Sequence, residues 1–141
     1  MKFTVEEAIN FAKKDRINEW IHKFLTTAGK NNHLSEIMKH QGHFYGPIEI
    51  SFQKLKRCCG PEKNMKFHES KDKWGEIIAT MISEIKDGWQ VPPLIVWQIN
   101  SNLSIADGNH RFEALKKCGF NKYWAIIWFK SSEDFKRFKC P

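Results

Sequence analysis

The stretch that decides the fold is Ser-Ile-Ala-Asp-Gly-Asn-His-Arg-Phe-Glu-Ala-Leu-Lys-Lys-Cys-Gly, residues 104–119. At its start, apolar and polar residues alternate as they do in a half-buried strand, and Asp107-Gly108 then breaks the run. Phe112 and Leu115 follow at helical spacing, and Gly119 suits the position just after a helix. The stretch therefore predicts a strand, a tight polar turn and a helix that begins near residue 109.

The first turn of this expected helix carries Asn109, His110 and Arg111. Backbone N–H groups in a first turn have no acceptor within the helix, and the positive end of the helix dipole lies there. The Arg111 guanidinium adds a fork of donors that matches a phosphate or a carboxylate. These features favour an anionic ligand, and we expect one that carries phosphate.

The length and composition indicate a globular protein rather than a disordered or membrane-spanning one. With 141 residues, of which 41% are hydrophobic and 13% aromatic, the chain is long enough for one domain with its own core. The longest apolar run, residues 123–129, is too short to cross a membrane, and the amino terminus lacks the apolar region of a signal peptide. We therefore expect a soluble cytoplasmic protein.

The net charge indicates which kinds of partner the protein attracts. A formal net charge of +7 favours anionic partners and leaves nucleotides, nucleic acids and phosphorylated metabolites open.

The chain has four cysteines and no Cys-x-x-Cys pair among them: Cys58, Cys59, Cys118 and Cys140. Adjacent cysteines do not readily share a disulfide or one tetrahedral metal, so we expect reduced thiols.

The rest of the chain predicts further elements. A capping box at Thr4 opens a long amphipathic helix that ends near Ala28-Gly29. The expected elements after it are a short helix at 34–40, a loop at 42–47, a strand at 48–52, a turn or short helix at 55–57, a helix at 74–85, a hairpin of strands 94–98 and 103–106, a strand at 123–129 and a helix from about 131. Residues 58–72 lack periodicity, and a loop of that length inside a compact domain usually serves a function.

The Pro-Pro strand, the motif Asp-Gly-x-His-Arg at 107–111 with Glu-Ala at 113–114, and Gly119 together resemble the ParB/sulfiredoxin superfamily over about residues 47–129. The resemblance implies an α/β (α+β) fold with a small mixed sheet, in which the strand-to-helix loop holds nucleotide phosphates. It also implies a helical extension at 1–46 packed on the same domain, and a nucleotide-binding domain at 47–141.

Three branches of the superfamily can be compared with this sequence. Sulfiredoxins carry a catalytic cysteine directly before His-Arg, where this chain has Asn109, and asparagine cannot form a thiol-linked intermediate. Chromosome-partitioning ParB proteins carry a Gly-Glu-Arg-Arg motif and a following helix-turn-helix domain, whereas about a dozen residues follow the last expected strand here. Free-serine kinases carry Asp-Gly-x-His-Arg and an upstream His-Glu, which His68-Glu69 matches.

The resemblance to the kinase branch implies that Glu69 deprotonates a substrate hydroxyl. For such chemistry Asp107 would ligate Mg²⁺ or fix the loop, and His110 would contact a phosphoryl oxygen or shuttle a proton. Backbone N–H groups of Gly108, Asn109, His110 and Arg111 would cradle the phosphates of ATP or another nucleotide, and the Arg111 side chain would balance developing charge. We therefore expect Mg²⁺-dependent phosphotransfer to a small hydroxyl-bearing substrate, such as a free amino acid, or nucleotide hydrolysis.

Plainer interpretations of the same residues stay open. The Asp-Gly step is a common turn, Asn109 is a common helix cap, and Glu113 is a natural partner for Lys117. Glu69 is equally compatible with a loop carboxylate near the start of the next helix. A non-enzymatic DNA-binding or partitioning-related ParB-like module is the alternative function, and the oligomeric state is open.

Other residues favour a site less strongly. His40 and His43 lack a third ligand at a fixed spacing, which argues against zinc. Tryptophans such as Trp74 and Trp97 have apolar neighbours and are expected in the core rather than as base-stacking platforms. The basic clusters at 54–57 and 136–139 either contact phosphate or are solvated.

Overall fold

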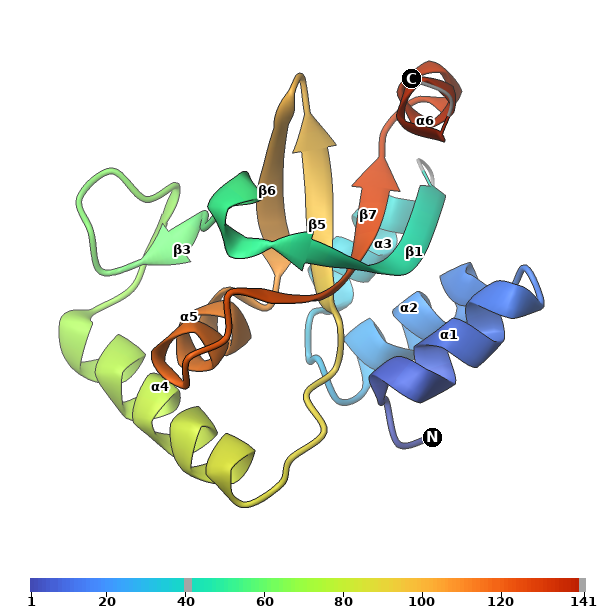
Figure 1. Cartoon of the computed structure of the whole chain (residues 1–141). Coiled ribbons are helices and arrows are strands. Elements are labelled where there is room, and N and C mark those ends of the chain that lie inside the picture. The colour runs from blue at the N-terminus through green and yellow to red at the C-terminus, as the bar shows by residue number, and fades with distance from the viewer. Residues whose placement is uncertain (40–41, 140–141) are drawn as a thin grey trace.

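The computed structural model describes residues 1–39 and 42–139, in which helices surround one central sheet (Figure 1). The helices are α1 (Val5–Lys13), α2 (Ile17–Thr26), α3 (Asn32–Lys39), α4 (Lys71–Lys86), α5 (Asn109–Lys117) and α6 (Ser132–Lys139). The strands are β1 (His43–Ser51), β2 (Leu55–Lys56), β3 (Cys59–Gly60), β4 (Phe67–His68), β5 (Leu94–Ile99), β6 (Asn102–Asp107) and β7 (Lys122–Phe129), and a 3-10 turn, η1 (Phe52–Lys54), precedes β2. None of the helices in this part of the chain has the length and apolar character needed to span a bilayer.

The central sheet is mixed. Its strand order is β1-β7-β5-β6-β2, and β3 pairs separately with β4. The pairs β1–β7 and β5–β6 are antiparallel, whereas β7–β5 and β6–β2 are parallel. The expected fold class, α/β with a small mixed sheet, is therefore confirmed, and so is the hairpin of β5 and β6.

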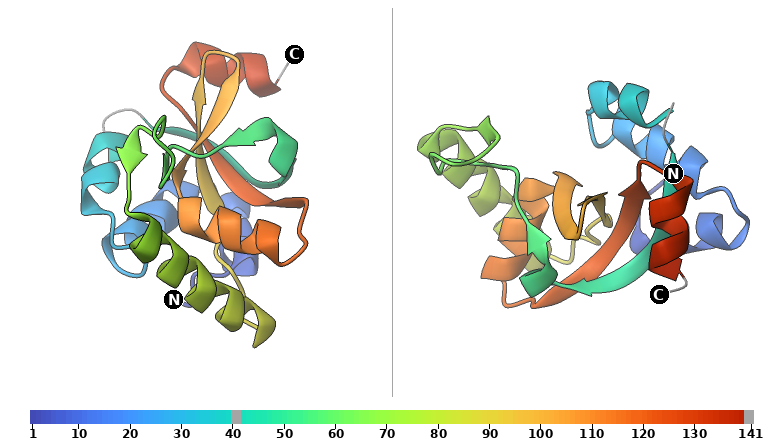
Figure 2. Two further views of the ribbon diagram at one scale, coloured as in Figure 1. Left: turned by 90° about the vertical axis from the view of Figure 1, so that its left-hand side faces the viewer. Right: turned by 90° about the horizontal axis from the view of Figure 1, so that it is seen from above.

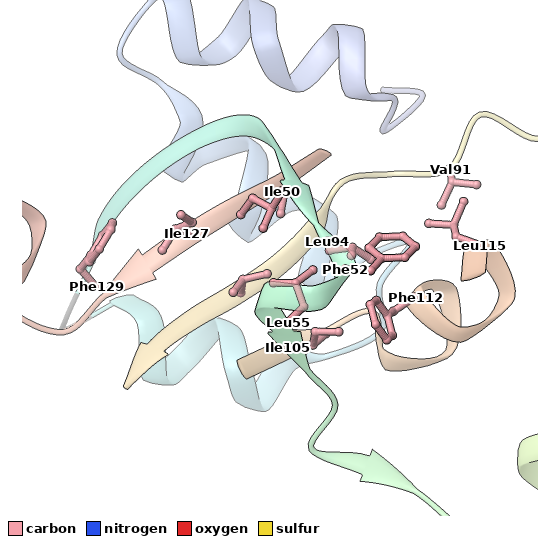
Figure 3. Close-up of a cluster of buried hydrophobic side chains, with 12 residues drawn as sticks. Ile50, Phe52, Leu55, Val91, Leu94, Ile105, Phe112, Leu115, Ile127 and Phe129 are labelled. Carbon is pink, nitrogen blue, oxygen red and sulfur yellow. The ribbon is translucent and has the colours of Figure 1, made fainter. Parts of the chain in front are cut away.

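One face of the sheet packs against α5. Strand residues alternate between faces, so Leu94 of β5 and Ile127 of β7 point to this side together with Ile105 of β6. Phe112 and Leu115, one helical turn apart, close the core from α5 (Figure 3). This packing fixes the direction of α5 relative to β6, and with it the turn at residue 108.

The other face is covered by α1, α2 and α3 (Figure 2). Ile95 and Trp128 each come directly after a strand residue that points to the first face. They therefore point to this second face, where they pack against Trp20, Phe24 and Leu25 of α2. The rings of Trp20 and Phe24 stack with centroids 5.3 Å apart. A third, smaller cluster joins α4 to α5, so the helices that carry the candidate site are held together.

Four elements differ from the sequence-based expectations. Residues 55–57, where a turn or short helix is expected, contain β2, which pairs with β6. The single long helix expected near the amino terminus is two helices, because Asp15 adopts the left-handed conformation with φ of 55° between them. Residues 43–47 of the expected loop at 42–47 belong to β1, whose pairing with β7 shifts between Tyr45 and Ile48, so the sheet begins before residue 47. The loop expected at 58–72 contains β3 and β4 and the first residues of α4.

Candidate functional site

The turn between β6 and α5 leaves the start of a helix without a side-chain cap. Gly108 is the N-cap of α5 and adopts a left-handed conformation with φ of 108°. A Cβ at this position would lie 2.8 Å from Nη2 of Arg111 and 2.9 Å from Cδ2 of Leu94, so only glycine fits. No side chain caps α5, unlike α1 and α4, which Thr4 and Ser70 cap. The first-turn N–H groups therefore remain donors for an anion.

Asn109 holds a neighbouring segment against this turn. Its side-chain oxygen accepts hydrogen bonds from the backbone N–H groups of Cys58, at 2.9 Å, and Cys59, at 3.3 Å. Its amide nitrogen donates to the carbonyl of Ile105 at 3.2 Å. Asn109 is buried, so its side chain fixes the segment that follows β2 rather than capping the helix or facing a ligand.

Arg111 and Asp107 form a buried ion pair. The Arg111 side chain donates to Asp107 at 2.8 Å and to the carbonyls of Pro92 and Pro93 at 2.9 Å each, and it lies over the ring of Phe24. The residue is only 5% exposed. Burial lowers the pKa of Arg111, and the charge of Asp107 opposes that shift.

This geometry bears on the roles expected of Arg111 and Asp107. The Arg111 guanidinium packs against the turn at Gly108, is buried and already donates to three acceptors in the protein, so it supports the turn from within. The second oxygen of Asp107 accepts from the Asn31 side chain at 3.1 Å. The two hydrogen bonds fix the end of β6, which is one of the two roles that the sequence left open for Asp107, and its role as a ligand of Mg²⁺ stays a prediction.

Glu69 and His110 meet beside the open turn. Nε2 of His110 lies 3.0 Å from each carboxylate oxygen of Glu69, although the two residues are 41 positions apart. The ring of Trp74, from α4, packs on the ring of His110 with centroids 4.7 Å apart. We call Glu69 and His110 together the Glu69–His110 pair. The neighbouring His68 points elsewhere, with Nε2 at 3.1 Å from the carbonyl of Pro61.

The surroundings set the charge of Glu69. Burial raises the pKa of Glu69, but the hydrogen bond and charge of His110, together with the Cys59 thiol and Lys73, outweigh burial and lower the pKa. Cys59 donates to Glu69 at 3.6 Å. Burial and the negative charge of Glu69 raise the pKa of the Cys59 thiol to about 11. Near neutral pH the site therefore holds a carboxylate and an unreactive thiol.

A second group of charges, centred on Arg57 of the basic cluster at 54–57, lies beside the site. The Arg57 side chain lies over the Trp74 ring at 4.8 Å and pairs with Glu62, and its Nε lies 3.5 Å from Glu113. Glu113 thus pairs with Arg57 and not, as expected, with Lys117. Arg57 therefore joins the segment after β2 to both α4 and α5 and holds the walls of the site in place.

The donor set does not form a metal centre. Among the residues that the structure describes, no group of three or more His, Cys, Asp or Glu side chains is arranged to hold a metal ion. His40 of the expected His40-x-x-His43 pair lies outside these residues. Hollows of about 580 and 480 Å³ lie beside β1 and at the far end of α5, and neither includes a residue of 107–111.

No model of a protein family matches the chain, and neither does any curated protein. Solved structures do. The chain is similar to a sulfiredoxin from Arabidopsis thaliana, with 19% identity, a TM-score of 0.40, and coverage of 70% of this chain and 98% of that one. Two structures of a pNOB8-like ParB N-domain match with 18% and 17% identity and TM-scores of 0.38 and 0.39, over 67% and 65% of this chain and about a third of theirs.

Proposed function

We propose that this chain binds a nucleotide such as ATP or ADP at the start of α5 and transfers its terminal phosphoryl group to a small hydroxyl-bearing compound or to water. The observation that carries the proposal is the Glu69–His110 pair, in which His110 lies in the first turn of α5, a helix that no side chain caps, and Glu69 reaches it from the segment before α4. An anion-binding group and an acid–base pair are the two parts that phosphoryl transfer needs.

Phosphate binding rests on the backbone. The N–H groups of the first turn and the positive end of the helix dipole offer donors and positive potential to a phosphate at the amino end of α5. The net charge of +7 attracts a nucleotide to the surface. Arg111 supports this binding indirectly, because its ion pair with Asp107 holds the turn in place.

Proton transfer is assigned to the Glu69–His110 pair. Glu69 carries negative charge at neutral pH, and its carboxylate accepts a hydrogen bond from Nε2 of His110. A hydroxyl placed between this pair and the terminal phosphate would pass its proton to the pair as its oxygen attacks phosphorus. Magnesium would enter bound to the phosphates of the nucleotide, and we assign no step to it, since the side chains here do not form a metal site.

Nucleotide binding and transfer can be measured separately. With ATP or ADP and Mg²⁺, we expect the melting temperature of the protein to rise with nucleotide concentration. Phosphorus NMR of the same mixture with a panel of hydroxyl amino acids, other small alcohols and a no-acceptor control should show a phosphorylated product or free phosphate. The absence of both nucleotide-dependent stabilisation and phosphate release would contradict the proposal.

Substitution of the pair tests its role. Glu69→Gln should lower turnover by about 10²–10⁴-fold and leave nucleotide-dependent stabilisation intact, because it removes the proton acceptor and not the backbone donors. Glu76→Gln, on the exposed side of α4, is the matched control and should turn over like the unaltered chain. Equal turnover in the two variants would show that Glu69 takes no part in proton transfer.

A further inference from the structure

A group of aromatic and lysine side chains lies outside the candidate site. It consists of Lys66, Phe67, Trp97 and Lys130, which we call the aromatic–lysine patch. Nζ of Lys130 lies 4.1 Å from the centre of the Trp97 ring, and Nζ of Lys66 lies 5.9 Å from the same ring and 5.5 Å from that of Phe67. Segments distant in sequence therefore bring two ammonium groups to one indole.

The charges of the patch are not neutralised by the protein. Lys66 and Lys130 are exposed and take part in no ion pair within residues 1–39 and 42–139. Arg57 and Arg111, by contrast, are each paired with a carboxylate. The chain as a whole is strongly basic, so the patch offers two free cations to an anionic partner.

The aromatic members favour bases over other anionic groups. Phe67 is 57% exposed, so its ring is accessible to a ligand. Trp97 is half-buried because it packs on Trp128 with ring centroids 5.1 Å apart, and this contact gives the lysines a rigid support. Exposed rings that stack on bases, interleaved with cations that contact phosphates, are the means by which proteins bind single strands.

We propose that the aromatic–lysine patch binds single-stranded nucleic acid, with Phe67 as a stacking surface and Lys66 and Lys130 as phosphate contacts. A duplex fits less well, because its bases are already stacked and paired and would not reach Phe67. The patch is a second site. Trp97 lies opposite Ser104 on β6, which is about 10 Å along that strand from Asp107 at 3.3 Å per residue, and Phe67 lies two residues before Glu69 in the chain. The binding does not depend on the proposed phosphotransfer.

Fluorescence anisotropy with labelled single strands of about 15 nucleotides tests this proposal. We expect oligothymidylate or oligouridylate to bind, and the two arms distinguish DNA from RNA. Lys66→Ala with Lys130→Ala should weaken binding at least tenfold and reduce the slope of log affinity against log salt by about 1.4, because two phosphate contacts are lost. Phe67→Ala should weaken binding about tenfold through loss of stacking.

The controls separate this patch from general charge and from the proposed active site. Lys86→Ala with Lys117→Ala removes the same charge from exposed helix ends and should change affinity less than twofold. Glu69→Gln should bind the single strand as the unaltered chain does, and the lysine variant should melt at the same temperature. No binding, equal loss in the two lysine double variants, equal affinity for a duplex of the same length, or equally strong competition by polyglutamate would each overturn the proposal.

Discussion

At the level of single residues, the motif at 107–111 divides its side chains between support and chemistry. Asp107, Asn109 and Arg111 point into the protein and fix the turn, while His110 points to Glu69. The residue types alone could not separate these tasks, because an arginine suits a phosphate and a buried carboxylate equally well. What separates them is burial, and burial depends on the residues around Pro92 and Phe24.

We predict that Arg111→Ala destabilises the fold as a whole. The substitution leaves the Asp107 carboxylate and two proline carbonyls buried without their donor, which should cost about 3–5 kcal/mol of the free energy of unfolding in urea. Arg137→Ala removes an exposed pair with Glu133 and should cost less than about 1 kcal/mol. If the two variants unfold at similar urea concentrations, Arg111 is not the support that its contacts indicate.

The Glu69–His110 pair predicts a dependence of stability on pH. The folded-state pKa of Glu69 lies below its ordinary value of 4.5, so below that value the unfolded chain binds a proton that the folded chain does not. This contribution is present above about pH 4.5 and is lost as the pH falls through the folded-state pKa. Glu69→Gln should therefore show a shallower loss of stability on acidification than Glu76→Gln, by urea unfolding at a series of pH values; identical slopes would contradict the assignment.

At the level of elements, the turn between β6 and α5 determines the site. The sequence predicted both elements and the Gly108 break, because the hydrophobic period changes from strand-like to helical across it. The pattern did not predict the division of the amino-terminal helix, since α1 and α2 bury the same kind of apolar stripe and the stripe continues across Asp15. The pattern also did not predict β3 and β4, because strands of two residues are too short to show the alternation of apolar and polar residues that marks a strand.

Gly108 at the N-cap of α5 and Gly75 inside α4 should respond to alanine in opposite ways. Gly108→Ala forces a Cβ against Arg111 and Leu94 at a left-handed φ, and we expect a loss of about 1–3 kcal/mol in stability and of nucleotide-dependent stabilisation. Gly75→Ala, within α4 and with no atom within 4 Å of the added carbon, should raise stability by about 0.5–1 kcal/mol. Urea unfolding measures both, and a stable Gly108→Ala variant would contradict the close packing of the turn.

At the level of the whole molecule, the sheet is buried on both faces. The α1–α3 helices cover Ile95 and Trp128, while α5 covers Leu94 and Ile105, so neighbouring residues of one strand belong to different cores. Because each face would be exposed without its helices, the extension at the amino terminus and the rest of the chain are expected to fold together.

We therefore predict a single unfolding transition. Urea curves followed by tryptophan fluorescence and by far-ultraviolet circular dichroism should coincide, because the probes report on one cooperative unit. Leu25→Ala, in the core beneath α2, should shift both curves by about 2–5 kcal/mol. Separate transitions, or a shift in only one of the curves, would show that the amino-terminal helices unfold independently.

The sequence by itself determined the local elements around residue 108, the α/β class and the presence of donors at the start of a helix. These follow from periodicity and turn chemistry, which act over a few neighbouring residues. Only the tertiary structure decided which side chains face that turn. Asn31 reaches Asp107 across 76 positions, and Glu69 reaches His110 across 41, so the contacts that hold the turn and complete the pair arise from packing and leave no local pattern.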